Sequence, residues 1–152
     1  AKIHYQKATD IDQNYAQAYF QLAKTLQNPS EFDQAFRNFE TALEIDSSMT
    51  ECHYHFANLL IKGEKLKNDG TLVLEPDLNR AESHLRKAIE IDANYYLAYY
   101  KLGNLLCILE KHSLAYESYI KCIQIEESFA KAHYKIAVLL MSGKVDDKLL
   151  ST

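Results

Sequence analysis

The sequence predicts an all-α protein built as a solenoid of antiparallel helix pairs. Three observations lead to this prediction. Apolar residues recur at steps of three and four, which places them on one face of a helix. These helical patterns come in pairs joined by short turn clusters, and the pair recurs along the 152 residues. One pair leaves apolar surface uncovered, so repetition supplies the core.

Residues 16–49 contain one complete helix pair. Its first pattern is Tyr19, Leu22, Ala23 and Leu26. Its second pattern is Phe32, Ala35, Phe36, Phe39, Ala42 and Leu43. Between them, Asn28-Pro29-Ser30 is a turn cluster that also offers an N-cap. Because the connection is short, the two helices are expected to lie antiparallel.

A small residue marks the same place in the second helix of every copy. These residues are Ala8, Ala42, Ala88 and Cys122. The first two are 34 residues apart and so are the last two, whereas the middle interval is 46, or 34 plus an insertion of 12. Similar segments close each copy: TDIDQNY, LEIDSSM, IEIDANY and IQIEESF. The chain is therefore internally repetitive.

A helix-turn-helix repeat of 34 residues resembles the tetratricopeptide family. Its small residue in the first helix is matched by Ala23, Ala57, Gly103 and Ala137, each preceded by Leu22, Phe56, Leu102 or Ile136. The second helix opens on Ala1, Ala35, Ala81 and Ala115. Two places depart from the family: Tyr19, His53, Tyr99 and His133 replace the usual Trp, and Gln13, Ser47, Ala93 and Glu127 replace the closing Pro. The resemblance covers nearly the whole chain and implies a right-handed superhelix.

The predicted organisation is a single array over residues 1–152. It comprises the second helix of a partial repeat (1–15), a repeat (16–49), a repeat with an insertion at about 64–76 (50–95), a repeat (96–129) and a partial repeat (130–152). Because the helix in 1–15 has no first helix before it, we expect the chain to be a fragment of a longer tetratricopeptide-repeat protein.

The insertion carries a strong turn signal, Asn68-Asp69-Gly70, between KLK and TLVL. A small β-hairpin and an extended loop both fit this pattern. After Gly143 the repeat falters, since Leu149 stands where the next opening Ala is due.

Composition narrows the classes of partner. A net charge of −4 and a pI near 5.9 argue against nucleic acid or an anionic membrane as the main partner. No apolar run reaches the ~20 residues of a membrane span, so membrane insertion is not expected. Cys52, Cys107 and Cys122 each occupy a helical packing place. Reduced thiols predict a cytoplasmic protein, with the nucleus or a cytoskeletal or ciliary assembly as open alternatives.

The residues capable of chemistry do not form a catalytic or metal-binding pattern. His53 and His55 are two apart and point to different sides of a helix, and no C-x-x-C or H-x-x-x-H spacing occurs. Cys52 and His53 are adjacent, so their side chains diverge. Four scattered glycines do not make a phosphate-binding loop. The sequence therefore predicts no enzyme, no metal and no cofactor.

The resemblance implies that the first helices line a concave groove. Inward places give the candidate partner-binding residues Phe20, Lys24, Tyr54, Asn58, Tyr100, Lys101, Asn104, Lys131, Tyr134 and Lys135. An aromatic residue recurs in all four helices. Two compatible interpretations are packing between neighbouring helices and contacts to an extended peptide or helix.

The predicted function is a scaffold or adaptor that binds a peptide or helical segment of another protein in this groove, as part of a larger complex. One alternative is a structural segment of a multiprotein assembly that docks by its convex face and loops. Another is a non-catalytic targeting arm of a larger enzyme. Fold alone does not choose the partner.

Lys101, Lys131 and Lys135 lie at inward or groove-edge places, and they raise the further expectation that the bound peptide is acidic. Tetratricopeptide domains that hold the acidic C-termini of heat-shock chaperones use a Lys/Asn/Asn/Lys/Arg clamp. Asn58, Lys131 and the basic Lys135 correspond to it, but Tyr54 replaces its first Lys and Lys101 its second Asn. The match is partial, and a solvated face of lysines is the other interpretation.

Overall fold

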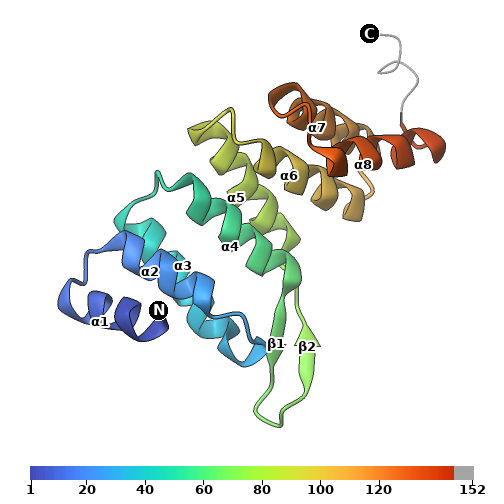
Figure 1. Cartoon of the computed structure of the whole chain (residues 1–152). Helices are drawn as coiled ribbons and strands as arrows, with labels where there is room; N and C mark the ends of the chain where they lie inside the picture. Colours follow the sequence, from blue (N-terminus) through green and yellow to red (C-terminus); the bar gives the residue numbers. More distant parts are fainter. Residues whose placement is uncertain (146–152) are drawn as a thin grey trace. The chain divides into compact units, whose positions relative to one another are not determined.

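The computed structural model describes residues 1–145, which form eight α-helices, one short 3-10 helix and one pair of β-strands (Figure 1). The all-α solenoid prediction is confirmed. The end of the predicted partial repeat, 146–152, lies outside the described residues. The chain divides into two compact units, Ala1–Lys87 and a second from Ala88 onward, and the division falls within one helix. The single array over the whole chain stays a prediction.

The first unit is built from successive helices packed side by side. They are α1 (Lys2–Ile11), α2 (Ala16–Thr25), α3 (Phe32–Ile45), α4 (Thr50–Lys62) and α5 (Leu78–Ile91), in which the division falls. α1 packs on α2, α2 on α3 and α3 on α4. Phe39 of α3 links α2 and α4, because its ring centroid lies 6.4 Å from that of Phe20 and 5.4 Å from that of Phe56. The helical apolar spacing thus becomes a continuous core.

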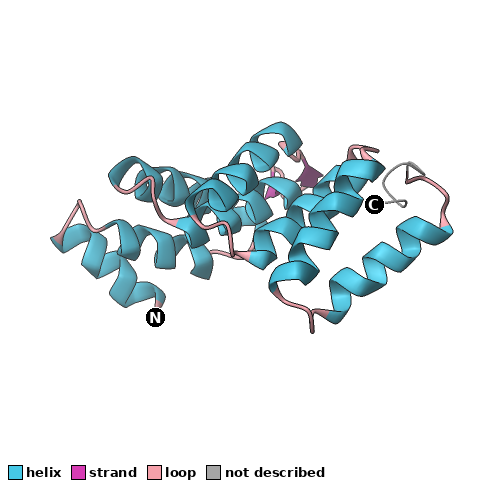
Figure 2. Cartoon of the chain, turned by 90° about the horizontal axis from the view of Figure 1, so that it is seen from above, coloured by secondary structure: helices cyan, strands magenta, loops and turns pink. Residues whose placement is uncertain are grey.

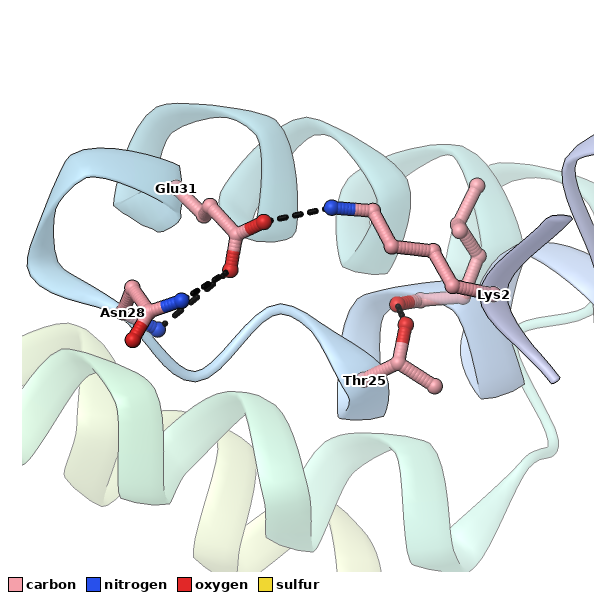
Figure 3. A network of polar contacts seen from close by, with 5 residues as sticks. Lys2, Thr25, Asn28 and Glu31 are labelled. Atoms are coloured by element: carbon pink, nitrogen blue, oxygen red, sulfur yellow. Dashed lines mark hydrogen bonds and ion pairs between the residues drawn. The ribbon is translucent and has the colours of Figure 1, made fainter.

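The turn cluster between α2 and α3 forms the 3-10 helix η1 (Pro29–Glu31). Pro29 occupies its first position, where no backbone N–H is needed. The Glu31 carboxylate accepts hydrogen bonds from the backbone N–H and side-chain amide of Asn28, and it pairs with Lys2 of α1 (Figure 3). Nearby, the Thr25 hydroxyl donates to the Leu22 carbonyl at the end of α2. The predicted turn is confirmed, with Asn28 at its N-cap.

The insertion is a β-hairpin, so the first of the two sequence interpretations holds. β1 (Glu64–Leu66) pairs antiparallel with β2 (Leu72–Leu74), with Lys65 opposite Val73. The only strands in the described part of the chain are these two (Figure 2). α4 ends at Gly63 with φ +57°, and a Cβ there would lie 2.4 Å from the Pro76 nitrogen. Glycine therefore allows the returning chain to pass close to the end of α4.

The second unit contains α6 (Tyr96–Ile108), α7 (His112–Ile125) and α8 (Ala130–Met141). α7 packs on both α6 and α8. Gly103, at the small-residue place of α6, faces the buried ring of Tyr119. A Cβ at position 103 would come within 2.5 Å of that ring. Close approach of α6 and α7 therefore depends on the missing side chain. No helix in the described range is long and apolar enough to cross a membrane.

Candidate functional site

A pocket of about 340 Å³ opens in the first unit among α2, the start of α3, α4 and β1. Its apolar lining is Ala23, Leu26, Phe32, Phe39 and Leu59. Its polar lining is Lys24, Gln27, Asn28, His55, Asn58, Lys62 and Glu64. Apolar walls with a few polar groups are the usual composition of a ligand site. The first helices of two successive repeats, α2 and α4, supply half of these side chains.

Two of the predicted binding residues meet in this pocket. Lys24 contributes an ammonium group that lies 5.0 Å from the centroid of the Phe20 ring. Asn58 contributes its side-chain amide, whose Oδ1 is buried and accepts no hydrogen bond from the described residues. A buried amide oxygen without a donor is destabilising.

Phe20 and Tyr54, the two predicted aromatic contacts of this unit, are buried instead. Phe20 is 1% exposed and Tyr54 9%. The Phe20 ring packs 6.4 Å from Phe39 and 5.7 Å from the His55 ring, centroid to centroid. For these two residues the packing interpretation describes the geometry, because both side chains are buried within the unit.

Sequence reasoning missed Lys62, Leu59 and Glu64 as pocket residues. Lys62 lies four residues after Asn58 on α4, so both side chains share one helical face. That spacing could have identified it. Glu64 belongs to β1, and no repeat signal predicts where an insertion places its side chains. The Lys62 Nζ and Glu64 carboxylate are 4.0 Å apart and well exposed, so this ion pair contributes little. Two ammonium groups against one carboxylate leave the pocket positive.

The remaining predicted residues belong to the second unit. Asn104 accepts a hydrogen bond of 2.8 Å from the Tyr119 hydroxyl. The Tyr100 ring packs 5.0 Å from Phe129 and 5.9 Å from Tyr119. Burial raises the pKa of Tyr119, so its hydroxyl keeps the proton that Asn104 binds. These contacts hold α6 against its neighbours within the unit.

The predicted lysines and tyrosine of the second unit differ in exposure. Lys131 and Tyr134 of α8 are exposed, the latter by 68%. Lys101 of α6 is half-buried. Lys135 lines a separate cavity of about 230 Å³ with Cys107, His112, Val138, Leu139, Ser142 and Lys144. None of the other nine predicted residues lines that cavity. That the side chains of this unit contact a partner stays a prediction.

A pair of histidines joins α4 to α5, and the sequence did not indicate it. The Nδ1 atoms of His53 and His84 are 2.8 Å apart, and His53 Nε2 lies 3.0 Å from the Ser47 carbonyl oxygen. Because a carbonyl only accepts, His53 carries its proton on Nε2, so His84 must donate from Nδ1. Burial lowers the pKa of both, and burial with the nearby His53 and Arg80 lowers that of His84 to about 4. The neutral pair is a structural link between helices.

Cys52 and Cys122 are buried, whereas Cys107 is half-buried. All three are free, and burial raises the pKa of Cys52 to about 12 and of Cys122 to about 11. Thiols held in this way are poor nucleophiles. Across residues 1–145, no three His, Cys, Asp or Glu side chains come together as a possible metal site.

Comparison with known proteins identifies the repeat. A sequence model described as the tetratricopeptide repeat matches residues 16–49 and 96–129, the two repeats predicted to be uninterrupted. No curated protein sequence matches the chain.

Several solved structures share the fold. The crystal structure of MamA is 22% identical, with a TM-score of 0.77 over 97% of this chain and 79% of that one. YrrB, titled a TPR protein with an unusual peptide-binding site, is 22% identical, with a TM-score of 0.76 over 94% and 68%. The first TPR of Spaghetti (RPAP3), bound to the HSP90 peptide SRMEEVD, is 15% identical, with a TM-score of 0.71 over 86% and 94%. At these identities the likeness establishes the fold.

Proposed function

Because the chain belongs to the tetratricopeptide-repeat family, we propose that it is a protein-interaction scaffold that holds a peptide segment of a partner in the α2–α3–α4 pocket. The observation that carries this proposal is the convergence of Lys24 and Asn58, both predicted as partner contacts, on one apolar-walled cavity. Peptide binding by YrrB and by the RPAP3 domain, as their titles state it, supports the same class of function.

The lining of the pocket favours an acidic peptide with an apolar side chain. Lys24 and Lys62 offer two ammonium groups at the rim, while Leu26, Phe32 and Leu59 offer apolar surface within. Asn58 lines the same pocket and adds a polar side chain to its wall. Charge at the rim accelerates the encounter, and the apolar floor and the amide provide specificity.

The test is a binding titration with a reversed-charge variant. An array of short acidic peptides, each carrying one Leu or Phe, is titrated against the parent chain and against Lys24→Glu with Lys62→Glu. We expect the pocket variant to bind at least tenfold more weakly, and the parent to lose affinity as salt rises to 1 M, where the Debye length is ~3 Å. Lys7→Glu with Lys121→Glu has the same net charge at exposed positions and serves as the control. The proposal is contradicted if the two double variants bind equally well. It is also contradicted if neither the parent nor either variant binds any of the peptides.

A second candidate, a structural segment of a larger assembly, is favoured by the exposed apolar residues of α8. Tyr134 is 68% exposed, Val138 43% and Met141 89%. Large apolar patches on a surface mark protein contacts. Retention of the intact protein in a stable complex should then fail for Tyr134→Glu with Met141→Glu and survive the pocket variant. The opposite outcome supports the pocket.

A further inference from the structure

The two faces of the hairpin differ in what they contact. β1 packs against η1 and the start of α3, and Lys65 lies with its Nζ 6.0 Å from the centroid of the Phe32 ring. Lys65 also pairs with Glu75 at 2.6 Å. On the opposite face stand three leucines. Leu66 is 41% exposed, Leu72 53% and Leu74 66%. Leu66 and Leu72 are directly opposite each other, and Leu74 follows two residues on, so the leucines form one row.

The outer edge of β2 presents unpaired backbone groups. Hydrogen bonds join Lys67 to Thr71 and Glu75 to Gly63, so Lys65 and Val73 between them form a hydrogen-bonded pair. Leu72 and Leu74 alternate with these residues, and their N–H and C=O groups therefore point away from β1. In residues 1–145, β1 is the only element that packs extensively on β2, and no backbone partner occupies this edge. An open edge of this kind is a template for another strand.

The residues that flank β2 in the sequence include three carboxylates. The exposed residues Asp69, Glu75 and Asp77 flank the strand, whereas the lysines nearby belong to β1, the turn or α4. The Lys65 ammonium holds the pKa of the Glu75 carboxyl below its usual range, so Glu75 is ionised at neutral pH. A strand that lies along β2 thus meets leucines on one face and carboxylates at its two ends.

We propose that the β2 edge is a docking site for an extended segment of a partner protein, which adds as a third strand and alternates apolar with basic residues. Its apolar side chains extend the leucine row, its backbone pairs with Leu72 and Leu74, and its basic residues meet Asp69, Glu75 and Asp77. A second copy of this chain fits poorly, because two such edges bring like charges together. Two three-residue strands also bury far less than the ~1,200 Å² of a stable interface. This site is independent of the α2–α3–α4 pocket.

Peptide chemistry tests the strand pairing without altering the protein. The probe is a fluorescein-labelled peptide of sequence Lys-Leu-Lys-Leu-Lys-Leu-Lys, titrated by anisotropy against the full chain. In an added strand, alternate backbone nitrogens face β2. N-methylation of one alternating set should therefore weaken binding about tenfold or more, and methylation of the other set should change it less than twofold. The leucine nitrogens are the sensitive set for antiparallel addition and the lysine nitrogens for parallel addition. Equal effects of the two sets overturn the proposal, and so does a peptide that does not bind.

Two substitutions at one position provide the matched protein variants. Leu74→Pro removes an edge N–H that β1 does not use, so the hairpin remains and the probe should bind at least tenfold more weakly. Leu74→Thr keeps the N–H and should weaken binding only a few-fold. Undiminished binding by Leu74→Pro overturns the proposal. So does a concentration-dependent dimer of the parent that Leu74→Pro converts to monomer, because the occupant is then a second copy. If Leu74→Pro disturbs the Lys65 and Val73 amide signals, the methylated peptides decide.

Discussion

The His53–His84 pair links the protonation of two side chains to the packing of α4 on α5. One Nδ1 must donate and the other accept, so the hydrogen bond holds while at least one ring is neutral and is lost when both are protonated. Several charged groups face the pair. Glu40 and Asp77 favour protonation of His84 and Arg80 opposes it, while Lys87 opposes protonation of His53. Arg80 is itself held by Glu40 at 2.6 Å and lies 4.8 Å from the Phe36 ring centroid. The Arg80 charge is therefore held in place beside the histidine pair.

We expect acid to destabilise the first unit through this pair. The folded pKa of both histidines is depressed below the ordinary value of 6.5, to about 4 for His84. The neutral forms thus contribute stability that is fully present above pH 6.5 and is lost as the pH falls towards 4. Urea unfolding of His84→Phe should show a flatter dependence on pH in this window than the parent. The exposed His133→Gln is the control. An unchanged slope in His84→Phe would rule out the pair as the source.

Gly103 is the residue on which α6–α7 packing in the second unit depends. Gly103→Ala places a methyl group 2.5 Å from the Tyr119 ring, which is buried and bonded to Asn104. Overpacking of this kind costs about 1–3 kcal/mol, measurable as a lower urea midpoint. The same substitution made in Tyr119→Leu should cost much less. A full cost in both backgrounds contradicts the clash.

At the scale of elements, the hairpin is a self-contained addition between α4 and α5. Its one packed face meets Phe32, and its other face is exposed. Deletion of residues 64–76, rejoined by a short turn, should leave helix content and melting temperature nearly unchanged, because loop-closure entropy depends weakly on length. Circular dichroism measures both. A large fall in melting temperature would mean that the hairpin stabilises the core at Phe32.

Local signals in the sequence sufficed for the helices but not for every contact between them. The repeat predicted to begin at residue 50 opens with α4 (Thr50–Lys62), and Gly63 ends this helix just before the predicted insertion. The turn at Asn68-Asp69-Gly70 allowed either a hairpin or an open loop, and the contacts of β1 with η1 and α3 have no local signal in the sequence. His53 and His84 are separated by 31 residues, and no periodic pattern joins them. The sequence placed Lys24 and Asn58 on the inner face of their helices, and both line the α2–α3–α4 pocket. The burial of Phe20, by contrast, depends on three helices at once.

At the scale of the molecule, stability in a solenoid is distributed from neighbour to neighbour, so the ends should be the weakest parts. Ile3 and Ile11 of α1 are 70% and 85% exposed, and Met141 of α8 is 89% exposed. Hydrogen exchange should protect residues 16–129 most, and 1–11 and 130–145 least. Uniform protection along the chain is incompatible with this expectation.

A ¹⁵N–¹H spectrum of the chain, titrated with the tightest peptide of the acidic array, tests directly whether a partner peptide binds in the α2–α3–α4 pocket. We expect saturable shifts that cluster at Lys24, Gln27, Asn58, Lys62 and Glu64, including the side-chain amide of Asn58. These shifts should vanish in Lys24→Glu with Lys62→Glu. Shifts confined to α7 and α8, with the pocket signals unmoved, would contradict this expectation.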